Sequence, residues 1–206
     1  MNRFYASVAA FVVVSMIGGS LGYVYLNKGN DAFAECRNGQ VGGGSIGGPF
    51  TLVNGNGETV TDKEVLSGPS LVYFGYTFCP DVCPLDNARN AEAVDILEEN
   101  GFAVTPVLIT IDPKRDTPEV MRDYVENLHP RMIGLTGSEE QVEAAKQAYK
   151  AYARKQDGDP EFYLMDHSTF TYLMLPKIGF VDFFRRDETA DAMAERVACF
   201  LSNAPD

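Results

Sequence analysis

Two cysteines separated by three residues lie where a predicted strand gives way to a predicted helix. The apolar residues 71–76 are typical of a buried strand, and residues 85–100 are typical of a helix. Cys79 and Cys83 lie between them, and each precedes a proline. Pro84 suits a first helical position, which predicts Cys83 as the N-cap. Near the positive end of a helix dipole a thiol is shifted toward thiolate, the form that binds soft metals and attacks disulfides.

The order of the predicted elements indicates an α/β domain. A β-hairpin is expected at residues 50–61, and a second apolar strand at residues 104–111 follows the cysteine-bearing helix. Strand, helix and strand then form a parallel unit with a right-handed crossover. Further helices are expected at residues 118–127, 138–151 and 189–202, and a second hairpin at residues 169–184. This order is that of a thioredoxin-like domain with an N-terminal β-hairpin and insertions.

The helix that follows the cysteines has a mixed sequence. We expect its inner side to carry Leu85, Ala88, Val94 and Leu97. Its polar residues are then expected to point away from the sheet.

The N-terminal residues predict a membrane anchor. Residues 4–26 are apolar apart from three serines, several glycines and other small residues, and about 20 such residues span a bilayer core. Arg3 directs the N-terminus toward the cytoplasm and the main domain to the outer side. A cleaved secretory signal ending at residues 32–34 is the alternative, but the apolar run is long for a signal core. We expect one transmembrane helix in the inner membrane, with a periplasmic domain.

These predictions divide the chain into three parts. Residues 1–34 form the anchor and the start of a tether, residues 35–48 form a glycine-rich linker, and residues 49–206 form the thioredoxin-like domain. Residues 42–47 formally match the dinucleotide pattern G-x-G-x-x-G. No predicted strand precedes them and no predicted helix follows, so the linker interpretation is favoured.

The charge of the chain restricts its partners. A formal net charge of −12 repels nucleic acid, so no nucleic-acid partner is expected. An acidic surface suits a cation or a basic protein.

The spacing of the cysteines suits a metal site. Cys-x-x-x-Cys is one residue longer than the motif of thioredoxins, and the extra residue lets two sulfurs diverge around one ion, although a disulfide remains an alternative. His167 precedes a predicted strand whose preceding loop faces the cysteines in a thioredoxin-like layout. Two thiolates select Cu(I), an imidazole also allows Cu(II), and zinc accepts the same ligands. His129 is interpreted as structural.

Four motifs resemble those of a known family. Residues 73–84, Tyr-Phe-Gly-Tyr-Thr-Phe-Cys-Pro-Asp-Val-Cys-Pro, closely resemble the copper-site motif of the SCO/SenC family. Residues 112–119, 134–137 and 166–168 resemble its later motifs in the same order. The resemblance, over roughly residues 48–200, implies a membrane-tethered thioredoxin-like protein that binds copper. It implies the copper-bearing subunit of cytochrome c oxidase as a partner, with an upstream copper donor, and Cys79, Cys83 and His167 as the metal ligands.

Five other residues are harder to interpret. Asp112 and Asp116 match family positions, and turn and cap chemistry is the preferred explanation, while Asp81 shapes the loop or meets a partner. Cys36 and Cys199 lie outside the motifs, and four cysteines allow three pairings. If Cys79 and Cys83 hold metal, we favour a disulfide between Cys36 and Cys199 over two unrelated thiols.

Three functions are compatible with these residues. The first is a copper chaperone that takes up copper and passes it to an acceptor by ligand exchange. The second is a thiol–disulfide oxidoreductase in which Cys79 or Cys83 attacks a partner disulfide. The third, a peroxidase, ranks last because Val72 and Tyr76 occupy the positions where such enzymes usually have proline and threonine. The residues fit a metallochaperone better than a catalyst.

Overall fold

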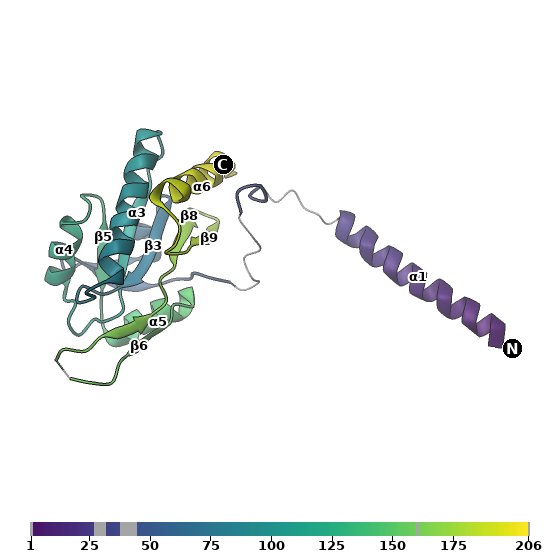
Figure 1. The fold of residues 1–206 in the computed structure, drawn as a ribbon, viewed down its shortest axis with the longest axis horizontal. Coiled ribbons are helices and arrows are strands. Elements are labelled where there is room, and N and C mark those ends of the chain that lie inside the picture. The colour runs from purple at the N-terminus through teal and green to yellow at the C-terminus, as the bar shows by residue number, and fades with distance from the viewer. Residues whose placement is uncertain (1, 27–31, 38–44, 160, 206) are drawn as a thin grey trace. The chain divides into compact units, whose positions relative to one another are not determined.

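A mixed seven-stranded sheet organises the larger of two compact units, which comprises residues 36–202. The other unit contains residues 1–35 and 203–206. The computed structural model describes residues 2–26, 32–37, 45–159 and 161–205. Figure 1 shows the helices of the larger unit lying against this sheet, and the core is made largely of residues from these elements.

The strands of the sheet follow a thioredoxin-like order. From one edge to the other they are β2 (Thr59–Thr61), β1 (Thr51–Asn54), β5 (Ile133–Thr136), β4 (Thr105–Thr110), β3 (Ser70–Gly75), β8 (Thr171–Leu175) and β9 (Gly179–Phe184). β3 is parallel to β4 and antiparallel to β8. All six residues of β3 are buried, as expected for a central strand whose sheet is covered on both faces. Both predicted hairpins and the predicted parallel pair are present.

Helices connect and cover the strands. They are α2 (Asp62–Val65), α3 (Val82–Glu99), α4 (Pro118–Glu126), α5 (Glu139–Tyr149) and α6 (Ala190–Ser202). α3 links β3 to β4 and packs against α6 (Figure 1). Thr117 caps α4 through its side chain, and Ser138 opens α5 with a capping box.

A second, smaller sheet stands apart from the main one. β6 (Ala153–Lys155) pairs with β7 (Met165–His167), with Ala153 opposite His167. β7 includes His167, which lies shortly before β8. Among the described strands, β7 pairs with β6 alone.

The start and the inner face of α3 differ from the prediction. The N-cap is Asp81, and Cys83 is the second helical residue. Pro84 follows directly and is tolerated there. The N–H groups of the first helical turn have no acceptor within the helix, so the N–H that proline lacks costs no hydrogen bond. The predicted inner residues Val94 and Leu97 are buried, but Leu85 is 61% exposed and Ala88 is also exposed. Polar residues take their places, as described below.

The N-terminal prediction is not confirmed. α1 runs over Asn2–Leu26. Over the residues described here, no helix combines the length and the apolar character needed to cross a membrane. Residues 38–44 of the predicted linker lie outside the described residues.

A disulfide lies within the larger unit. It joins Cys36 to Cys199 of α6 across a sequence separation of 163 residues, which is the pairing favoured above. Cys79 and Cys83 remain free thiols.

Candidate metal centre

Three side chains from distant parts of the chain meet at the carboxyl end of β3. Cys79 lies in the loop after β3, Cys83 in the first turn of α3, and His167 at the end of β7. Their ligand atoms all lie within 4.8 Å of one another, and Cys83 Sγ is 3.4 Å from His167 Nε2. Among the described residues this is the one such group of three or more side chains. Two sulfurs and one imidazole nitrogen are the donor set that suits a soft, copper-like cation.

The two thiols differ in their proton affinity. A hydrogen bond from the Cys83 thiol lowers the pKa of Cys79 to about 3, with smaller contributions from His167 and from two backbone N–H groups, while burial opposes this shift. The backbone N–H of Cys83 donates to Cys79 Sγ at 3.2 Å. The same hydrogen bond, together with burial, raises the pKa of Cys83. These shifts favour a thiolate at Cys79 and a protonated thiol at Cys83.

His167 presents the nitrogen that a metal needs. Its Nδ1 lies 2.9 Å from the carbonyl oxygen of Ser168, which can only accept a hydrogen bond, so we assign the ring proton to Nδ1. Nε2 then carries the lone pair and faces the sulfur of Cys83. The rings of Tyr73 and Tyr76 pack edge-on against the imidazole, with centroids at 6.2 and 5.9 Å, and help to orient it.

Glycine is required next to the sulfurs. A Cβ at Gly75 would lie 3.1 Å from Cys83 Sγ and 2.8 Å from the ring of Tyr73. The glycine at the end of β3 therefore lets the strand pass close behind the site.

Buried polar residues of α3 make hydrogen bonds close to the cysteines. The Tyr73 hydroxyl donates to buried Asp86 at 2.9 Å, and Asn87 Nδ2 donates to the Cys83 carbonyl at 2.8 Å. Asn90 is also buried, and its Oδ1 accepts from the Thr171 hydroxyl at 3.0 Å. These partners explain why the buried face of α3 is polar where the sequence suggested an apolar one.

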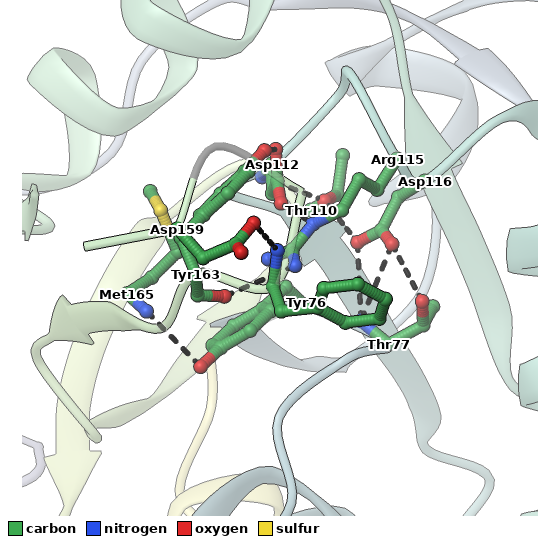
Figure 2. A network of polar contacts seen from close by, with 10 residues as sticks. Tyr76, Thr77, Thr110, Asp112, Arg115, Asp116, Asp159, Tyr163 and Met165 are labelled. Atoms are coloured by element: carbon green, nitrogen blue, oxygen red, sulfur yellow. Dashed lines mark hydrogen bonds and ion pairs between the residues drawn. The ribbon is translucent and has the colours of Figure 1, made fainter. Parts of the chain in front are cut away.

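The loop between β4 and α4 supports the cysteine loop. The carboxylate of Asp116 accepts from the backbone N–H of Thr77 at 3.1 Å, from its hydroxyl at 2.6 Å, and from the Thr110 hydroxyl at 2.5 Å (Figure 2). Burial raises the pKa of Asp116, and these hydrogen bonds oppose the shift. The preferred explanation of Asp116 as cap chemistry is therefore wrong, because Thr117 is the cap and Asp116 holds the segment two residues before Cys79.

Asp112, in the same loop, binds two residues near the site. Its carboxylate binds Arg115 Nε at 2.5 Å and accepts from the Tyr163 hydroxyl at 2.8 Å. The motif at residues 112–119 did not predict the roles of Arg115 and Tyr163. The only available signal was the motif itself, because Tyr163 lies 51 residues beyond Asp112.

His129 has a structural role, as predicted. It is buried, its Nε2 lies 3.1 Å from Asp95 Oδ1, and its Nδ1 accepts from the backbone N–H of Arg131 at 3.1 Å. Both ring nitrogens are thereby occupied.

Comparison with known proteins identifies the family. The sequence model of the SCO1/SenC family matches residues 38–202. The chain belongs to the SCO1/SenC family. Protein SenC of Rhodobacter capsulatus is 52% identical over 198 residues, which cover 95% of this chain and 88% of SenC. The mitochondrial SCO1 homologue of Mus musculus is 36% identical over 191 residues, 90% of this chain and 67% of its own length.

Solved structures of the family show the same fold with copper bound. ScoI of Arabidopsis thaliana with copper bound has a TM-score of 0.73 and 39% identity, covering 77% of this chain and 99% of its own. Yeast Sco1 with copper bound also has a TM-score of 0.73, with 34% identity over 79% of this chain and 91% of its own. The thioredoxin-like α/β fold is thus confirmed, and relatives of this chain bind the metal that its thiolate and imidazole donors favour.

Proposed function

We propose that this protein is a copper carrier that binds one copper ion through Cys79, Cys83 and His167. The observation that carries the proposal is the convergence of two sulfurs and one imidazole nitrogen within 4.8 Å of one another. The copper bound to two solved relatives supports the choice of metal. Two thiolates favour Cu(I), and the imidazole also allows Cu(II).

Each residue has a distinct part in uptake. Cys79 is already a thiolate and provides the first donor. Cys83 binds after its thiol proton has left, so copper uptake releases a proton. His167 offers Nε2, because its other ring nitrogen lies 2.9 Å from the Ser168 carbonyl oxygen.

Delivery follows from the small number of ligands. A Cu(I) ion with three protein donors has room for an incoming thiolate, so it can pass to an acceptor by ligand exchange without a free-ion step. We propose that the acceptor is the subunit of cytochrome c oxidase that bears the dinuclear copper site, and that an upstream donor loads the carrier. Both partners rest on the family resemblance.

A thiol–disulfide oxidoreductase is the alternative, and the low pKa of Cys79 favours it. The Cys79 thiolate would attack a partner disulfide, forming a mixed disulfide and releasing one partner thiolate. Cys83 would then lose its proton and displace the second partner thiolate, leaving a Cys79–Cys83 disulfide. The partner gains two electrons and the carrier loses them, which would prepare the acceptor's cysteines for copper. His167 would be dispensable for this reaction.

Copper titration separates the two functions. The reduced chain, purified without oxygen, is expected to bind one Cu(I), and Cys79→Ser or Cys83→Ser is expected to abolish tight binding. His167→Ala is expected to weaken it, whereas His129→Gln serves as the control histidine and should leave it unchanged. Copper affinity that is unaffected by His167→Ala, with disulfide reduction intact, would favour the oxidoreductase.

Membrane attachment and a periplasmic location are part of the proposal, and their support is the sequence alone. Residues 4–26 are largely apolar and follow Arg3, the pattern of a tether whose domain lies on the outer side. Extraction of the native membranes tests this directly. Recovery of the intact protein in the soluble fraction would contradict the attachment.

A further inference from the structure

The strand that carries His167 is not held by the main sheet. β7 pairs with β6 in a separate two-stranded sheet, and among the described residues no strand of the seven-stranded sheet pairs with either. The cysteines, in contrast, follow directly from β3 at the centre of that sheet. β8, which pairs with β3, begins four residues after His167, so the position of His167 relative to the sulfurs depends on this short connection and on contacts between the hairpin and the rest of the domain.

Several of those contacts are made by one side chain, Arg115. Its Nη1 donates to the Tyr163 carbonyl at 3.0 Å, and its guanidinium lies 3.7 Å from the centre of the Tyr163 ring (Figure 2). The Tyr163 hydroxyl donates in turn to Asp112, which also binds Arg115 Nε. Arg115 thus holds Tyr163, four residues before His167, by its carbonyl and by its ring.

The same guanidinium reaches the cysteine loop. It lies 4.8 Å from the centre of the Phe78 ring and 5.7 Å from that of Tyr76. The Tyr76 hydroxyl accepts from the backbone N–H of Met165 at 3.1 Å, which makes a second link between loop and hairpin. Arg115 therefore contacts residues from both halves of the site.

The loop that carries Arg115 is itself fixed to the cysteine segment. Asp116, the next residue, binds Thr77 through its backbone N–H and its hydroxyl. Because Asp116 is fully buried and bound to β4 through Thr110, this attachment does not depend on the hairpin. The short segment 112–116 thus holds the cysteine loop with one residue and the His167 hairpin with another.

We propose that Arg115 is a positioning residue that clamps the β6–β7 hairpin so that His167 Nε2 lies beside the two sulfurs. The inference rests on the proposed function, and it adds a residue that determines whether the third ligand is in place. Loss of the clamp frees His167 while the cysteine pair, held by Asp116, keeps its geometry. A planar guanidinium is needed because it donates from two nitrogens and stacks on a ring at once.

Amide exchange in the reduced, metal-free, full-length chain tests the clamp without copper. In Arg115→Gln the Met165 amide, which reports docking of the hairpin on Tyr76, is expected to exchange at least about tenfold faster by NMR. The Thr77 amide should keep its protection. Lys155→Met is the matched control, because Lys155 lies 3.6 Å from the centre of the same Tyr163 ring but is a residue of the hairpin itself. It should leave Met165 unchanged.

Arg115→Lys separates geometry from charge. Lysine keeps the positive charge but cannot make the forked contact, so it is expected to behave like Arg115→Gln. Full protection of the Met165 amide in Arg115→Lys would overturn the clamp. A Met165 amide that exchanges at the wild-type rate in Arg115→Gln would also overturn it, even if that variant is less stable overall.

Copper affinity provides a second test of the clamp. Arg115→Gln is expected to weaken copper binding about 10- to 100-fold, the usual effect of losing a residue that orients a ligand. In a His167→Ala background it should have little further effect, because the ligand that it positions is gone. An equal additional loss in that background would overturn the inference. If His167→Ala alone leaves copper affinity unchanged, the proposed ligand set fails, and the Met165 measurement still tests the clamp.

Discussion

At the scale of single residues, the cysteine pair is an asymmetric one. Cys79 accepts hydrogen bonds from the Cys83 thiol and from the Cys83 backbone N–H at the start of α3. Cys83 is fully buried, so its proton is retained while Cys79 carries the charge. Such a pair presents one thiolate that can bind a soft metal or attack a disulfide, while the second sulfur remains a protonated thiol.

This asymmetry predicts a thiolate at unusually low pH. With its pKa lowered to about 3, Cys79 should remain ionised at pH 5 and lose its charge only as the pH falls toward 3. Absorbance near 240 nm of the reduced, metal-free chain measures this titration. Cys79→Ser should remove the low-pH absorbance, and Cys83→Ala should move the titration upward because the main hydrogen-bond donor is gone. A wild-type thiolate that appears only above pH 8 would contradict the assignment.

At the scale of elements, the close approach of β3 and α3 determines how the sulfurs are presented. Gly75 ends β3 directly behind Cys83, and any side chain there meets both Cys83 Sγ and the Tyr73 ring. Because Tyr73 is itself fixed by Asp86, its ring cannot move aside without breaking a buried hydrogen bond.

Gly75→Ala is therefore expected to destabilise the fold by about 1–3 kcal/mol, the usual cost of overpacking a buried site. Urea unfolding measures the loss, and the same variant should also bind copper more weakly. Gly68→Ala is the matched control, since nothing lies within 4 Å of a Cβ at that position. Equal stability of the two variants would show that the strand can shift without cost.

Some features of these elements could be predicted from the sequence, and others could not. The strand–cysteine–helix junction, both hairpins and the parallel β3–β4 pair followed from hydrophobic patterns and turn residues. The inner face of α3 did not, because Asp86 and Asn87 are buried against partners that the local sequence does not reveal. The role of Arg115 was missed for the same reason, because its contacts with Tyr163 form only in the folded chain.

At the scale of the whole molecule, the candidate site is assembled from three loops around one end of the sheet. The cysteine loop, the segment 112–116 and the β6–β7 hairpin each supply part of it. The covalent link between Cys36 and Cys199 involves none of these loops, because it joins the start of the larger unit to α6. Stability and metal binding should therefore respond to different changes.

Removal of this disulfide is expected to lower stability without altering the metal site. Closing a loop of 163 residues stabilises the fold by up to about 5 kcal/mol in the chain-entropy model. The double variant Cys36→Ser/Cys199→Ser should accordingly unfold at lower urea concentration than the oxidised wild type, yet bind one Cu(I) with unchanged affinity, because Cys79 and Cys83 are already free. Wild type treated with a mild reductant should match the double variant in unfolding. A loss of copper affinity in the double variant, with the fold intact, would show that the link between Cys36 and α6 reaches the site through the packing of α6 on α3.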